Sequence, residues 1–293
     1  MNQDVRLSRL VVSRRRALGL GGTLSLAGLL AGCGGSEQST ASSSGSASAS
    51  TSATARAVPT TASVTAVGAL LDKARTCTMS QEQTQGPYWF DVDSIRSDIR
   101  EDRPGTVLNL ALRVQDLSAC STGGTAAPVA NAVVEIWHCD AGGIYAGFET
   151  GSRGGAGGAP GGGPQGSGQT SNGSYSVGDS EGPTTDDGTY LRGAQVADVN
   201  GIVQFITIYP GWYRGRTVHI HLKVHRDKKT VLTTQLFMDE AINAEVFANS
   251  PYSDHTGRDV FNDDDNIYDD TGLLTISRQG NSYLGMLNLG IDT

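Results

Sequence analysis

The chain has 293 residues, 39 of them glycine, and a formal net charge of −8. Residues 1–32 carry five arginines and one acid, so the remainder holds 17 basic and 29 acidic residues, a net charge of −12. This acidic remainder has no lysine- or arginine-rich run, so we expect no nucleic-acid partner. Its length suffices for one domain with a sizeable core.

The N-terminal segment, residues 1–32, is typical of an export signal rather than of a folded element. Ser13 to Leu18 is typical of a twin-arginine signal, and the apolar stretch from Leu18 to Ala31 is too short and glycine-rich for a stable membrane span. Leu30 to Cys33 resembles a bacterial lipobox, in which the cysteine is acylated. We therefore expect lipidation at Cys33. The protein would be attached to a membrane by that anchor only and would face the periplasm or the cell exterior.

Residues 33–61 are mostly Ser, Thr, Ala and Gly. A segment of this composition buries too little apolar surface to offset its ordering entropy, so it predicts a flexible tether. The folded domain is then expected over residues 62–293.

Within this domain, residues 62–75 show a weak helical periodicity, and the later segments alternate apolar and polar residues or are rich in β-branched ones. These patterns predict an all-β fold, a β-sandwich of mostly antiparallel strands with long loops and a short N-terminal helix. Strands are expected at Val107 to Val114, Ala132 to Trp137, Ile202 to Tyr209, Val218 to Val224, Val231 to Met238, Gly272 to Arg278 and Tyr283 to Ile291.

Two segments lack regular periodicity and have both a functional and a purely structural interpretation. Glycine dominates residues 151–174, which we interpret as a tolerated surface insertion, with a lid over a site as the alternative. Asp263 to Asp265 lacks the spacing of a known calcium loop, so a solvated acidic turn is expected there.

Besides Cys33, the cysteines are Cys77, Cys120 and Cys139. An exported protein can form a disulfide, and three cysteines allow one bridge and one thiol. The sequence does not tell which pair forms.

His219 and His221 form the most informative motif, because side chains at i and i+2 of a strand share a face. Tyr209 and Tyr213 lie shortly upstream, and Tyr145 closes the segment from Trp137 to Tyr145. Two imidazoles with two phenolates form a hard, donating set that favours ferric iron. Tyr209 and Tyr213 compete for one ligand position, and the expected strand alternation favours Tyr209.

Seven motifs, in order and spacing, make the region from Cys77 onward resemble the intradiol ring-cleavage dioxygenases, non-haem ferric enzymes that open catechols between their hydroxyl groups. These motifs are Thr84 to Trp89, Trp137 to Tyr145, Tyr190 to Gln195, Asn200-Gly201 with Phe205, Tyr209 to Arg216, His219 to His221, and Thr234 to Phe237.

The resemblance implies Fe(III) as cofactor, bound by Tyr145, Tyr209, His219 and His221, with Tyr209 as the ligand that leaves when substrate binds. It implies further that Arg216 faces the bound ring, that Gln235 is a second polar residue of the pocket, and that Tyr88 and Trp89 line the substrate cavity. His138 and His225 are expected to be structural.

The expected function is extracytoplasmic cleavage of a catechol with O2 to a cis,cis-muconate-type diacid. The alternative is a non-catalytic lipoprotein that binds iron or another ligand on the same sandwich. A zinc hydrolase is disfavoured, because the sequence offers no convincing acid or third imidazole near the His pair. The sequence leaves open which catechol is used, the host's envelope type, and the oligomeric state, for which a homodimer is one alternative.

Overall fold

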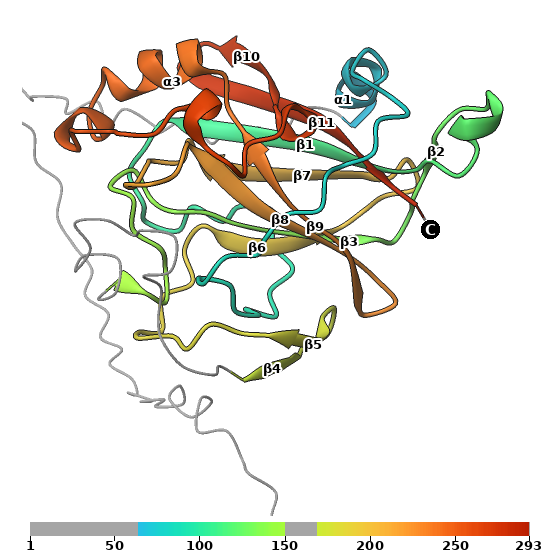
Figure 1. Ribbon diagram of the computed structural model, residues 1–293, viewed down its shortest axis with the longest axis horizontal. Coiled ribbons are helices and arrows are strands. Elements are labelled where there is room, and N and C mark those ends of the chain that lie inside the picture. The colour runs from blue at the N-terminus through green and yellow to red at the C-terminus, as the bar shows by residue number, and fades with distance from the viewer. Residues whose placement is uncertain (1–63, 150–168, 293) are drawn as a thin grey trace, which may run out of the picture. The chain divides into compact units, whose positions relative to one another are not determined.

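The computed structural model describes residues 64–149 and 169–292, and their strands form two main sheets and a small hairpin (Figure 1). The first sheet has the order β10-β11-β1-β2, with β7 also paired to β1; β1 and β11 run parallel and the other pairs antiparallel. It comprises β1 (Val107–Asp116), β2 (Ala127–Pro128), β7 (Ile202–Ile208), β10 (Thr275–Gln279) and β11 (Ser282–Ile291).

The second sheet is antiparallel throughout, with the order β6-β3-β8-β9. Its strands are β3 (Val133–Trp137), β6 (Arg192–Val196), β8 (His219–Arg226) and β9 (Lys229–Phe237), and a separate hairpin pairs β4 (Thr170–Asn172) with β5 (Val177–Ser180). Within the described residues, the helical elements include α1 (Val64–Leu71), α3 (Glu240–Phe247) and four 3-10 turns: η1 (Cys120–Thr122), η2 (Tyr252–Asp254), η3 (Asn262–Asp264) and η4 (Asp270–Gly272).

The main core lies between the two sheets. Leu110 and Leu112 of β1 belong to the same buried cluster as Ile220 and Leu222 of β8 and Ile136 of β3. Burying these aliphatic side chains, each worth about 1.5–3 kcal/mol, drives the sheets together. The all-β sandwich predicted from the sequence is therefore confirmed.

Alternation along β8 gives the second sheet a polar outer face. Ile220, Leu222 and Val224 face the core, so the residues between them face the opposite side. That opposite row is His219, His221, Lys223 and His225, and all four are buried.

Strand β5 and irregular chain cover this outer face and keep water from it. The ring of Trp89 lies under the Lys223 ammonium at 3.4 Å, and the same ammonium donates to Asp179 of β5 at 2.6 Å. The amide of Gly182 donates to the Trp89 carbonyl at 2.6 Å. The outer face of the second sheet is thus buried as well, among polar and aromatic side chains.

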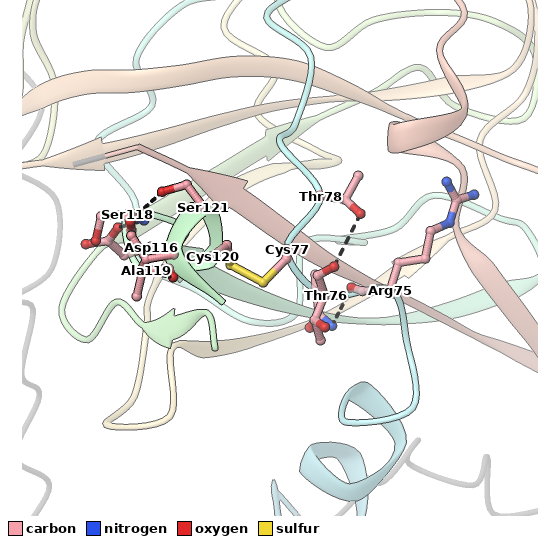
Figure 2. The surroundings of a disulfide bond; sticks show 11 residues. Arg75, Thr76, Cys77, Thr78, Asp116, Ser118, Ala119, Cys120 and Ser121 are labelled. Carbon is pink, nitrogen blue, oxygen red and sulfur yellow. Dashed lines mark hydrogen bonds between the residues drawn. A yellow bond between two sulfur atoms is a disulfide. The ribbon is translucent and has the colours of Figure 1, made fainter. Parts of the chain in front are cut away.

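A disulfide joins Cys77, in the segment before β1, to Cys120 in η1 (Figure 2). Cys139 is the remaining thiol, and it is buried. The pairing that the sequence left open is therefore Cys77 with Cys120.

The expected strands are present to within a few residues, and the helix expected over 62–75 is the shorter α1. Elements β2, β4, β5, β6 and α3 were not predicted, because they are short or lack a clear apolar period. No helix in the described ranges is long and apolar enough to cross a membrane. The export signal, Cys33, the tether and most of the glycine-rich segment lie outside the described residues.

Candidate active site

Two imidazoles point toward each other at the start of β8, with their Nε2 atoms 3.2 Å apart. The Nδ1 of His219 donates to the Thr217 carbonyl at 2.7 Å, so its Nε2 keeps the lone pair that faces the site. The ring of His221 stacks on Trp137 of the neighbouring strand, with centroids 5.0 Å apart and 5° between the planes. Both rings are therefore held before any ligand arrives.

Two phenols complete this cluster from different loops. The hydroxyl of Tyr145 lies 3.4 Å from the His219 Nε2, and the hydroxyl of Tyr213 lies 3.2 Å from the same atom. Tyr145 is buried, whereas Tyr213 is half-buried in the loop that leads to β8. We call Tyr145, Tyr213, His219 and His221 the donor cluster.

Glycines bring the two tyrosine loops together. Gly143 has φ +82°, and a Cβ there would lie 2.3 Å from the Trp212 carbonyl oxygen. A Cβ on Gly211 would lie 2.4 Å from the Asp140 carbonyl oxygen, which accepts the Gly211 amide at 3.1 Å. Only glycine allows these backbones to approach so closely, and this contact carries Tyr145 and Tyr213 to the same place.

The structure contradicts Tyr209 as a member of this cluster. Its hydroxyl donates to Asn243 of α3 at 2.7 Å, and its ring packs edge-on against Phe247 and Tyr283. Tyr209 follows β7 in the first sheet and belongs to the core between the sheets, whereas the histidines occupy the outer face of the second sheet. Tyr209 does share a face with Phe205, as the alternation predicts, but that face packs in the core, and Tyr213 takes the place expected for Tyr209.

Burial keeps the whole donor cluster uncharged. It lowers the pKa of His219 to about 3, with a further contribution from Arg216, and lowers the pKa of His221 well below its usual value. Burial also raises the pKa of the Tyr145 and Tyr213 phenols above the usual value. Neutral imidazoles can bind a metal at once, whereas each phenol must lose a proton to do so.

Arg216 lies beside the cluster, and its guanidinium is fixed at two points. Its Nε donates to Asp265 at 2.8 Å, and its Nη2 donates to the Gln235 side-chain oxygen at 2.6 Å. Gln235 pairs with His221 across β8 and β9, so both side chains lie on the same face of the sheet. The structure thus brings Arg216 and Gln235 together beside the histidines, as expected.

Asp265 differs from the solvated acid expected there, because its side chain is only 2% exposed. Burial alone would raise its pKa, but the charge of Arg216 and the amides of Ile267 and Thr217 hold the pKa below the usual value. The burial of Asp265 was not predicted, because nothing in the local sequence distinguishes this residue from the two exposed aspartates that precede it.

The two aromatic residues expected in the cavity have different surroundings. The Tyr88 ring stacks on Tyr145, with centroids 4.7 Å apart. Trp89 points toward the covered polar face, where its indole N–H donates to Glu135 at 3.0 Å. Tyr88 therefore touches the donor cluster, and Trp89 supports it through Trp137, whose ring lies 6.5 Å away.

Two of the three remaining histidines, His138 and His225, were expected to be structural, and both have structural partners. His138 bonds the Cys139 carbonyl and the Thr207 hydroxyl, at 2.8 and 2.7 Å. His225 pairs with Glu135 at 3.1 Å. Their partners agree with the structural roles expected for both.

The donor cluster is suited to a metal ion. Ligands about 2 Å from a common ion in tetrahedral array lie about 3.3 Å apart, close to the separations of 3.2–3.4 Å observed here. Within the described residues, no group of three or more His, Cys, Asp or Glu side chains forms a metal site. The companions of the His pair are phenols, which suit a hard cation.

We compared the chain with known proteins. No protein-family model and no curated protein sequence matches it. Among solved structures, it is similar to an intradiol ring-cleavage dioxygenase from Tetranychus urticae, at 33% identity and a TM-score of 0.60, over 74% of this chain and 95% of that one. A second structure, described as a dioxygenase, matches at 32% identity and a TM-score of 0.59 over the same shares.

The chain belongs to the intradiol ring-cleavage dioxygenases. The family resemblance expected from the motifs is therefore confirmed. The dioxygenase carries its donor cluster on the outer face of one sheet, with residues from three separate chain segments. Among the four donors, only His219 and His221 come from the same strand, β8.

Proposed function

We propose that this dioxygenase uses ferric iron to cleave a catechol between its two hydroxyl groups, inserting both atoms of O2 to form a cis,cis-muconate-type diacid. The observation that carries the proposal is the donor cluster: two neutral imidazoles and two phenols, in which both hydroxyls and the His221 Nε2 lie 3.2–3.4 Å from the His219 Nε2. The relatives' names as dioxygenases support it.

The iron would be held by Tyr145, Tyr213, His219 and His221, a set that differs from the sequence expectation in one tyrosine. Bound ferric iron would supply the Lewis-acid and one-electron chemistry that makes a chelated catechol reactive toward dioxygen. The chain's own contribution is to pre-position four donors in a site from which the covering loops exclude water.

Tyr213 is the phenol best placed to act as a base toward the incoming substrate. It lies in a loop and is partly exposed, whereas Tyr145 is buried and stacked against Tyr88. A phenol that gives up its place in the cluster can carry a substrate proton away with it. This role was expected for Tyr209, but the Tyr209 hydroxyl is bonded to Asn243.

Arg216 supplies a fixed positive charge beside the cluster. A guanidinium does not serve as a base in proteins, so the role of Arg216 is electrostatic. Because Asp265 and Gln235 hold it on two sides, it can stabilise negative charge developing on the substrate without having to reorganise.

The decisive experiment is a spectrum of the protein loaded with ferric iron. We expect a visible charge-transfer band from phenolate to iron, a shift of this band on anaerobic addition of catechol, and oxygen uptake when air is admitted. Iron-loaded protein without visible absorption would refute the proposed iron site. A coloured protein that consumes no oxygen with any catechol would instead favour the non-catalytic binder.

We also propose that the enzyme is exported and held to a membrane by a lipid on Cys33, facing the periplasm or the cell exterior. This rests on residues 1–33 of the sequence alone. In cells expressing the full chain, we expect the wild type in the membrane fraction and Cys33→Ser in the soluble extracytoplasmic fraction. Equal distribution of the two proteins would contradict the anchor.

A further inference from the structure

Through one carboxylate oxygen, Asp265 contacts both Arg216 and the peptide that leads to His219. Its Oδ2 accepts the Arg216 Nε–H at 2.8 Å and also the backbone amide of Thr217 at 2.8 Å. Its Oδ1 accepts the amide of Ile267 at 2.9 Å, which fixes the carboxylate plane. Both oxygens are therefore used, and the group cannot rotate without losing bonds.

The bond to Thr217 reaches the donor cluster. The carbonyl of Thr217 accepts the His219 Nδ1–H at 2.7 Å and so sets the tautomer and direction of that ring. The side chain of Thr217 is anchored separately, because its hydroxyl bonds the Asn262 oxygen at 2.6 Å. Asp265 and Asn262 thus hold this residue at its amide and its hydroxyl, so that its carbonyl is aimed at His219.

The bond to Arg216 extends the hydrogen-bond network toward the loop that lies over His221. The second contact of Arg216 is with Gln235, whose amide donates to the Thr84 carbonyl at 3.1 Å. Two residues after Thr84, a Cβ on Gly86 would lie 3.2 Å from the His221 ring. Asp265 therefore lies at one end of a chain of hydrogen bonds, through Arg216 and Gln235, that ends in the loop over His221.

We propose that Asp265 is a positioning residue of this active site, which aligns the Arg216 guanidinium and, through the Thr217 peptide, the His219 ligand. The inference rests on the proposed function, because it assigns Asp265 a part in metal binding and in turnover. It predicts two effects that a merely structural carboxylate would not combine.

The first effect is on the metal. We expect Asp265→Asn to weaken ferric-iron affinity of the metal-free protein about 10- to 100-fold in competition with a chelator, because His219 loses its fixed orientation. Asp264→Asn is the matched control, since Asp264 is exposed and adjacent, and we expect its affinity to be unchanged. Arg216→Gln leaves the Thr217 carbonyl in place, so its affinity should not fall as that of Asp265→Asn does.

The second effect is on turnover with catechol as the probe, measured at saturating iron. We expect Asp265→Asn to lower kcat about 10- to 100-fold. In an Arg216→Gln background the same change should have a much smaller effect, because the two side chains act as one unit. Additive effects in this double-mutant cycle, or equal affinities and kcat for Asp265→Asn and Asp264→Asn, would overturn the inference.

If Asp265→Asn does not fold, Asp265→Glu replaces it, with Asp264→Glu as control. The longer side chain keeps the charge but displaces its oxygens, so kcat and iron affinity should still fall below those of the control, and equality would overturn the inference. A wild-type protein that binds no ferric iron and consumes no oxygen would overturn the proposed function together with this inference. An active wild type with unaffected Asp265 variants would overturn the inference alone.

Discussion

Tyr213→Phe is expected to weaken and shift the visible band of the iron-loaded protein and to lower kcat/KM about 100-fold or more, because it removes one of the two phenolate donors and a base. Tyr209→Phe is expected to leave band and activity close to wild type. The reason is geometric: the Tyr213 hydroxyl lies 3.2 Å from the His219 Nε2, whereas the Tyr209 hydroxyl is bonded to Asn243. The test is to record the visible spectra and the steady-state kinetics of both variants and to compare them with the wild type.

The Tyr209 variant has a separate signature in stability. Removing its hydroxyl leaves the buried oxygen of Asn243 without that donor, which costs about 1–3 kcal/mol in unfolding free energy. A urea titration of the metal-free proteins should therefore show Tyr209→Phe as the less stable variant. If instead Tyr209→Phe weakened and shifted the visible band while Tyr213→Phe left it unchanged, the donor cluster described here would be wrong.

Arg216→Gln is expected to lower kcat by about 100- to 1000-fold while the iron-loaded protein keeps its visible band, because the change removes a fixed charge and no metal donor. Arg216→Lys should restore little of the activity. The guanidinium reaches Asp265 and Gln235 with two different nitrogens, and a single ammonium cannot reproduce this fork.

Arg214 provides the control for this prediction. It lies two residues earlier, its side chain is 55% exposed, and its paired carboxylate, that of Asp259, is 4.0 Å away. We expect Arg214→Gln to change kcat less than twofold, since exposed charge pairs contribute little. If Arg216→Gln and Arg214→Gln had the same kcat, the electrostatic role of Arg216 would be refuted.

The two tyrosines show most clearly what a local sequence pattern leaves undetermined. Alternation along residues 202–209 predicts a strand whose end carries Tyr209, and both the strand and its end are present as β7. The pattern of one strand tells which residues share a face but not which sheet the strand joins. Because β7 pairs with β1 rather than with the sheet of the histidines, the face that carries Tyr209 meets α3 in the core.

Asp265 illustrates a different limit. An aspartate in an acidic turn is usually solvated, and nothing local distinguishes it from Asp263 and Asp264. Its burial depends on Arg216, 49 residues earlier in the chain. An ion pair between such distant positions exists only after the sandwich has assembled.

By itself, the sequence determined the fold class, the positions of seven strands, the shared face of His219 and His221, and the residue types that could join them. Periodicities of two residues and local motifs carry this information, because they depend on backbone geometry over a few residues. The tertiary structure alone decided which tyrosine joins the histidines, which cysteines pair, and which acid holds Arg216. Those choices depend on how strands are distributed between two sheets and how loops cross between them, and no local pattern encodes that distribution.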